Sequence, residues 1–146
     1  MSIDYTQHDH LDHIVTITIN RPEARNSLDM AHFRDLAHAW AAFRDDANAW
    51  VAVITGVGHD FCTGADLKKF IPELTGDLPR PEGWNKDDAI HAVLHRFPVY
   101  KPIVAAVNGT CRGRLRNAGP DRHPGGRTRG AVRGDGAQTR TFRGWR

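Results

Sequence analysis

A few side chains in the first half of the sequence could carry chemistry. His8, His10 and His13 are spaced closely enough to bind a metal ion, but no carboxylate or thiolate geometry accompanies them. We therefore expect a solvated leader there and no metal site. Asp66 ends the segment 61–66, Phe-Cys-Thr-Gly-Ala-Asp, and its carboxylate could act as an acid or begin a helix as its N-cap. The second role is favoured, because an Asp at that position accepts the free N–H groups of the first helical turn.

The two cysteines, Cys62 and Cys111, do not suggest a disulfide framework, and a reducing, cytoplasmic location is expected. No run of 18 or more apolar residues exists, which excludes a membrane-spanning helix. The segment 1–13 is polar and has neither a basic start nor an apolar core, so no secretory signal is predicted. The chain has 146 residues, of which 40% are hydrophobic and 25% charged, as is usual for one globular domain.

The hydrophobic pattern indicates the elements that position these residues. Residues 13–20 alternate Ile and Val with Thr, which predicts a half-buried strand. Pro22 breaks that strand, and Ser27 is the expected N-cap of a helix with Asp29 in its first turn. The helix itself is predicted from apolar residues that recur at helical spacing: Met30, Phe33, Ala37, Trp40 and Phe43.

Two short apolar runs further along, at 51–55 and 103–107, predict buried strands. The loop 61–66 is expected to open a short helix at 67–70, followed by a surface excursion rich in Pro and Gly at 71–87. A third helix is predicted at 88–97. Strands that alternate with helices imply an α/β fold, with parallel strands joined by crossovers.

Three segments, in this order and at plausible spacings, together resemble the crotonase superfamily, also called the enoyl-CoA hydratase/isomerase family. They are Ile19–Leu28 (I-N-R-P-E-A-R-N-S-L), Val53–Leu67 (V-I-T-G, later D-F-C-T-G-A-D-L) and Tyr100–Gly109 (Y-K-P-I-V-A-A-V-N-G). The resemblance covers about the first 110 residues. It implies an incomplete crotonase-like spiral of ββα turns and, for the intact family, a homo-trimer or hexamer.

The same resemblance implies a chemistry, in which an enolate forms on a CoA thioester and two backbone N–H groups hold its oxygen. Ala65 matches the residue that supplies the first donor, and Gly64 lets the backbone approach the ligand closely. No cofactor is implied, because the CoA thioester is the substrate. Arg25 or Lys68 could meet a CoA phosphate. The residues that match the CoA and acyl path are Ala24, Arg25, Thr63, Asp66, Leu67 and Lys68.

The last part of the chain differs sharply in charge from the rest. Residues 1–110 hold ten Lys/Arg and fifteen Asp/Glu, a net charge of −5, whereas residues 111–146 hold ten Arg and two Asp, a net charge of +8. Half of residues 111–146 are Arg or Gly, without helical or strand periodicity. We therefore predict the N-terminal part of a crotonase-like domain at 1–110 and a non-native, disordered tail at 111–146.

The tail also departs from the family where the resemblance places catalytic groups. Arg114 stands where the family has the glycine of the second oxyanion donor, and neither family glutamate has a counterpart. If the codons of the tail are read one base later, the genetic code permits an amino-acid sequence like that of a crotonase. In that frame, a glutamate can be encoded across codons 116 and 117, and another across codons 136 and 137. We interpret the tail as a frameshift or a sequencing error, which an accurate DNA read across codons 105–120 would test.

The predicted function is that of an enoyl-CoA hydratase (a lyase) or isomerase that is truncated and inactive but keeps part of its acyl-CoA site. One alternative is an Arg/Gly-rich tail that binds nucleic acid, which a salt-sensitive shift of nucleic acid by the purified chain would indicate. Another is a non-catalytic fragment that docks onto intact crotonase subunits, which co-purification would reveal. Neither nucleic acid nor a membrane is the expected partner.

Overall fold

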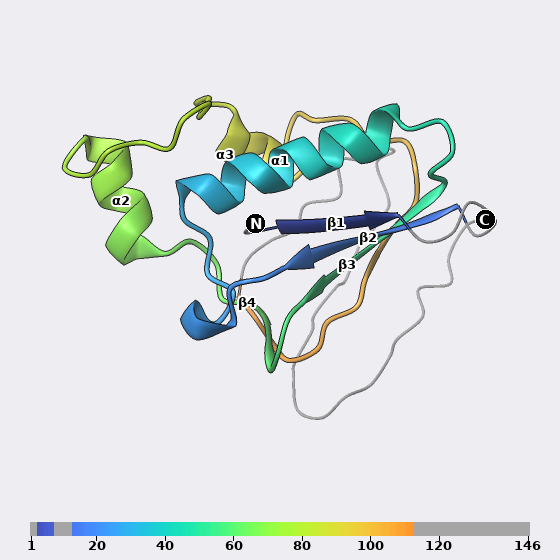
Figure 1. Ribbon diagram of the computed structural model, residues 1–146, viewed down its shortest axis with the longest axis horizontal. Helices are drawn as coiled ribbons and strands as arrows, with labels where there is room; N and C mark the ends of the chain where they lie inside the picture. The colour runs from blue at the N-terminus through green and yellow to red at the C-terminus, as the bar shows by residue number, and fades with distance from the viewer. Residues whose placement is uncertain (1–2, 8–12, 113–146) are drawn as a thin grey trace, which may run out of the picture.

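The computed structural model describes residues 3–7 and 13–112, so nearly all of the Arg/Gly-rich segment lies outside the described residues (Figure 1). The main sheet has the order β1 (Ile3–Gln7), β2 (Ile14–Ile19), β3 (Val51–Gly56) and β5 (Ile103–Ala105). β1 runs antiparallel to β2, and the other neighbours are parallel. A second, parallel pair joins β4 (Asp60–Cys62) to β6 (Thr110–Cys111). The predicted α/β fold with parallel strands is confirmed.

Helix α1 (Met30–Asp45) lies along one face of the main sheet (Figure 1). Every second residue of β2 and β3 is buried, because successive side chains of a strand point to opposite faces. Trp40 of α1 is fully buried, and its indole N–H donates to the carbonyl of Ala92 in helix α3 (Asp88–Ala92) at 3.0 Å. Other large side chains of this core are Val15, Ile17, Ile19, Phe33, Leu36, Phe43, Ile54 and Phe61.

The polar N-terminus predicted only a solvated leader, and for residues 3–7 that prediction is wrong. Ile3 pairs in register with Ile19 of β2, and its side chain is buried in the core. Tyr5 packs against the same core, and the polar residues Asp4 and Thr6 alternate with the apolar Ile3 and Tyr5 along the strand. The alternation marks a half-buried strand, but two apolar residues in five are too short a signal to distinguish from a leader.

Helix α1 begins after Asp29, whose carboxylate accepts from the His32 N–H at 3.1 Å, so the prediction of Ser27 as its N-cap is wrong. The physical reason is that Leu28 stays extended, because it pairs with the backbone of residues 64–66. A 3₁₀ turn (Pro22–Ala24) stands between β2 and this segment.

The two later helices differ from their predicted lengths in opposite directions. Helix α2 (Leu67–Thr75) is longer than the predicted 67–70 and continues through Pro72. Helix α3 stops at Ala92, short of the predicted residue 97, and Leu94 and Arg96 beyond it adopt left-handed φ angles of 56° and 57°. Left-handed backbone cannot continue a right-handed helix, which explains the early end.

Strand β5 is shorter than the predicted run 103–107, and its Val104 is 51% exposed. Its one neighbour within residues 3–7 and 13–112 is β3. The prediction of a fully buried strand is therefore wrong for this part of the chain. None of the helices in the described part is long and apolar enough to cross a membrane.

Candidate functional site

The loop between β4 and α2 is held against the segment that precedes α1. The Leu28 N–H donates to the Gly64 carbonyl, and the Asp66 N–H donates to the Leu28 carbonyl, each at 2.8 Å. Because N–H groups of extended backbone alternate in direction, the N–H of Ala65 points away from Leu28. Among the described residues no hydrogen bond from that N–H is found. Within the described part of the chain, the Ala65 N–H is therefore a free backbone donor.

Gly64 adopts a left-handed φ of 95°, which favours glycine over other residues. A Cβ at this position would lie 3.0 Å from the carbonyl oxygen of Arg112, which follows β6. The loop is thus enclosed by Leu28 on one side and by the end of β6 on the other. Any larger residue at this position would have to push the Arg112 backbone away.

An apolar cavity of about 150 Å³ lies beside this loop. Gly64 and Ala65 are part of its wall, and no Asp or Glu of residues 3–7 and 13–112 lines it. The cavity has room for an acyl group of a few carbons, but no lining residue in this part of the chain supplies a carboxylate for proton transfer. The apolar side chains around it include Ile19, Leu28, Phe33, Leu36, Ile54 and Phe61.

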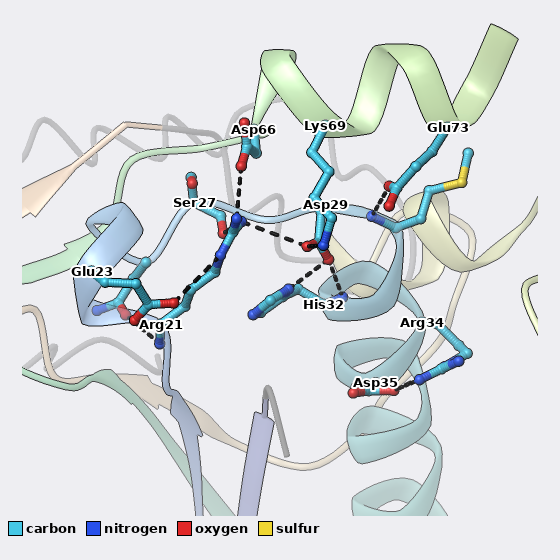
Figure 2. A network of polar contacts seen from close by, with 12 residues as sticks. Arg21, Glu23, Ser27, Asp29, His32, Arg34, Asp35, Asp66, Lys69 and Glu73 are labelled. Carbon is cyan, nitrogen blue, oxygen red and sulfur yellow. Dashed lines mark hydrogen bonds and ion pairs between the residues drawn. The ribbon is translucent and has the colours of Figure 1, made fainter. Parts of the chain in front are cut away.

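A polar network fixes the loop and α2 to the start of α1 (Figure 2). Arg21 forms an ion pair with Asp66 at 2.9 Å and also donates to the Ser27 carbonyl at 3.1 Å. Asp66 is in addition the N-cap of α2, since it accepts from the Lys68 N–H at 3.1 Å. The interpretation of Asp66 as a helix cap is therefore confirmed.

Asp29 is the centre of this network, and its side chain is only 1% exposed. Its carboxylate contacts the His32 ring at 2.6 Å and the Lys69 ammonium at 2.7 Å, as Figure 2 shows. Burial alone would raise the pKa of Asp29, but the hydrogen bonds from His32 and Lys69 outweigh it and hold that pKa well below its usual range. Asp29 therefore stays ionised in the folded chain.

Glu73 makes a second link between the two helices. Its side chain is buried, and its carboxylate accepts from the N–H of Met30, the first residue of α1, at 3.0 Å. A negative charge at a helix N-terminus interacts favourably with the unpaired N–H groups and the helix dipole there. Glu73 thus holds α2 at the start of α1.

The structure brings Thr63 and Arg25 together at the outer side of the loop. The Thr63 hydroxyl donates to the Arg25 carbonyl at 3.0 Å, and the Arg25 guanidinium binds Asp60 at 3.0 and 3.2 Å. That guanidinium also holds the pKa of Asp60 below its usual range. Ala24 is half-buried in the 3₁₀ turn just before Arg25.

Leu67 and Lys68 lie on the first turn of α2, exposed and outside the cavity wall. Lys68 forms no ion pair with any residue that the structure describes, whereas its neighbour Lys69 is bound to Asp29. Of the residues assigned to the site from the sequence, the cavity wall contains Gly64 and Ala65. Ala24, Arg25, Thr63, Asp66, Leu67 and Lys68 do not line it.

The sequence alone did not predict that Arg21, Lys69 and Glu73 contribute to this site. The sequence predicts Asp29 in a first helical turn, but it does not predict that the carboxylate contacts His32, Arg21 and Lys69. One available signal was the pair Lys69 and Glu73, which are four residues apart and so share one face of a helix. That signal was missed because the helix was predicted to end at residue 70.

No group of three or more His, Cys, Asp or Glu that could hold a metal ion occurs among residues 3–7 and 13–112. His8 and His10 lie outside the described residues. The His13 ring contacts the Asn48 carbonyl at 2.7 Å and stacks on Trp50, with ring centroids 3.9 Å apart. Arg114 and the two codon junctions discussed above are likewise beyond the described part.

Known proteins resemble this chain in sequence and in fold. The family described as Enoyl-CoA hydratase/isomerase matches residues 10–114. The (E)-benzylidenesuccinyl-CoA hydratase of Thauera aromatica is 40% identical over 101 residues, which are 67% of this chain and 37% of that protein. The mitochondrial Delta(3,5)-Delta(2,4)-dienoyl-CoA isomerase of Mus musculus is 32% identical over 108 residues, 69% of this chain and 33% of that protein.

Among solved structures, a probable enoyl-CoA hydratase/isomerase from Mycobacterium abscessus matches with a TM-score of 0.56 and 34% identity. That match covers 74% of this chain and 38% of the other. The chain thus spans 33% to 38% of the length of these relatives. Since the family match covers most of the residues of this chain, the chain belongs to the enoyl-CoA hydratase/isomerase family.

Proposed function

We propose that this chain holds the first half of an acyl-CoA site, in which the Ala65 N–H donates to the thioester carbonyl oxygen. The observation that carries the proposal is the free Ala65 N–H in the wall of an apolar cavity. A fixed backbone donor stabilises negative charge as it develops on the oxygen, because it needs no reorganisation during the reaction. The acyl chain would then occupy the cavity beside it.

The cation best placed for a CoA phosphate is Lys68. Arg25 is already bound to Asp60 through two hydrogen bonds, and Lys69 is bound to Asp29. Lys68 is exposed on the first turn of α2 and has no ion-pair partner among the described residues. A lysine in that state can meet a phosphate without giving up another contact.

The reaction proposed for the uninterrupted protein is addition of water to a 2-enoyl-CoA, or a shift of its double bond through the same enolate. This is lyase or isomerase chemistry of the fatty-acid type, and some relatives are named hydratases and others isomerases. The thioester is the substrate and no further cofactor is proposed. We also propose a cytoplasmic location and, for an intact family member, a trimer or hexamer.

The present chain is proposed to have no measurable turnover. No carboxylate of the described residues lines the cavity, and Arg114 replaces the glycine that the family resemblance assigns to the second donor. Loss of one oxyanion donor costs about 10²- to 10³-fold in rate. Loss of general acid/base catalysis costs about 10²- to 10⁴-fold more.

Calorimetric titration with butyryl-CoA, a saturated thioester that cannot be hydrated, tests the binding proposal. We expect butyryl-CoA to bind more tightly than free CoA, because it fills the apolar cavity. The variant Ala65→Pro, which lacks the N–H, should bind about three- to tenfold more weakly, as expected for one hydrogen bond. Ala65→Gly keeps the N–H and serves as the matched control.

Equal affinity for CoA and butyryl-CoA in the natural chain would contradict the proposed site. A separate assay measures the loss of enoyl-thioester absorbance with a short 2-enoyl-CoA. No rate above that of buffer is expected, and clear hydration by this chain would refute its proposed inactivity while leaving the binding site intact.

A further inference from the structure

Cys62 and Cys111 face each other across the small sheet. They are register partners in β4 and β6, and the Arg112 N–H fixes that register by donating to the Cys62 carbonyl at 2.8 Å. Adjacent strands lie about 4.7–4.9 Å apart, which falls within the Cα separation of about 4.4–6.8 Å found in disulfides. Both residues also line the same cavity, so their side chains point to one face. Both are free thiols in this structure.

The two thiols differ in access. Cys62 is buried, and its sulfur accepts from the Gly64 N–H at 3.5 Å, beside the loop that carries Ala65. Cys111 is half-buried, so a small reagent can reach it first. Burial raises the pKa of both thiols, and the nearby charge of Cys111 raises the pKa of Cys62 further.

We propose that Cys62 and Cys111 are a modification site, at which a small-molecule disulfide oxidises them to a reversible intrachain disulfide. In the first step the Cys111 thiolate attacks glutathione disulfide and releases one glutathione thiolate. In the second step the Cys62 thiolate attacks Cys111 of this mixed disulfide and releases the second glutathione. The two protein thiols lose two protons and two electrons, and one glutathione disulfide becomes two glutathione molecules.

The bond would join β4 to β6 next to the Ala65 loop. Its formation would take the Cys62 sulfur away from the Gly64 N–H and change the wall of the apolar cavity. The proposal itself does not require that the cavity binds a thioester, since the two register partners exist independently of any ligand.

The test is an equilibration of the full chain with oxidised and reduced glutathione at mildly alkaline pH, once in buffer and once in concentrated urea. Acid quenching, alkylation of free thiols and peptide mass analysis then report the Cys62–Cys111 crosslink. The measured quantity is the ratio of oxidised to reduced glutathione at which half of the natural chain is crosslinked. This ratio should be about tenfold or more lower in buffer than in urea, because folding brings the two thiols together.

The variants Cys62→Ser and Cys111→Ser are controls, and each should form only a mixed disulfide with glutathione. Equal ratios in buffer and urea would overturn the proposal. So would a natural chain that carries glutathione on both cysteines, forms only disulfides between two chains, or keeps both thiols at every ratio.

Discussion

The α1–sheet core and helix α2 belong to one chain but are held by different forces. The core consists of fully buried apolar side chains such as Trp40 and Ile17, and its stabilisation comes from removal of that surface from water. Helix α2 instead buries few apolar residues, exposes Leu67 and Leu74, and is fixed by Asp29 and Glu73 through charge and hydrogen bonds. Perturbations should therefore separate the two regions.

The largest effect is expected from a cavity in the core. Trp40→Ala removes a fully buried indole and its hydrogen bond to Ala92, and should lower the free energy of unfolding by about 3–5 kcal/mol. Urea denaturation followed by circular dichroism measures the change. Trp50→Ala is the matched control, since Trp50 is 61% exposed and stacks on His13. It should cost at most about 1 kcal/mol. Equal losses for the two variants would show that Trp40 does not pack as described.

The same division explains what the sequence could predict. Strand β2 and helix α1 carry strong periodic patterns and β3 is a short apolar run, so they were predicted from residues 13–20, from the apolar face of α1 and from residues 51–55. The 61–66 loop was identified from a family resemblance. The partners of Asp29 were not predictable in this way, because Arg21 and Lys69 approach it from separate elements and no periodicity encodes that approach.

A smaller but still large effect is expected from the centre of the polar network. Asp29→Asn keeps the shape and the cap of α1 but removes the charge that Lys69 and Arg21 share. Loss of charged hydrogen bonds at this buried position should lower the free energy of unfolding by about 2–3 kcal/mol. Asp45→Asn breaks an exposed pair with Arg44 instead, and should leave stability nearly unchanged. A neutral outcome for Asp29→Asn would mean that the network does not fix α2.

Low pH should weaken the stabilisation that Asp29 provides. The pKa of Asp29 is lower in the folded chain than its ordinary value of 3.8, so folding favours the ionised form. That stabilisation is complete above pH 3.8 and is lost as the pH falls towards the folded pKa. We expect the urea midpoint to fall between about pH 4 and pH 2.

Part of that slope belongs to Asp45 and Asp60, whose pKa values are held low by hydrogen bonds from Arg44 and Arg25. The Asp29→Asn variant isolates the contribution of Asp29, because only its own share of the slope disappears. If the natural chain and the variant lose stability in parallel as the pH falls, Asp29 is not the titrating group that matters.

The smallest effect that the comparison predicts concerns Glu73, and it separates charge from hydrogen bonding. In Glu73→Gln the amide oxygen can still accept from the Met30 N–H, but the negative charge at the start of α1 is gone, at a cost of about 0.3–1 kcal/mol. Glu73→Ala also leaves that N–H unpaired and should cost about 1–3 kcal/mol. Glu82→Gln, at an exposed position on the loop after α2, is the control for loss of a charge alone.

Hydrogen exchange of the Met30 amide gives a direct readout, and it should quicken more in Glu73→Ala than in Glu73→Gln. If both variants lose the same stability, the carboxylate acts through its charge rather than as an acceptor that ties α2 to α1.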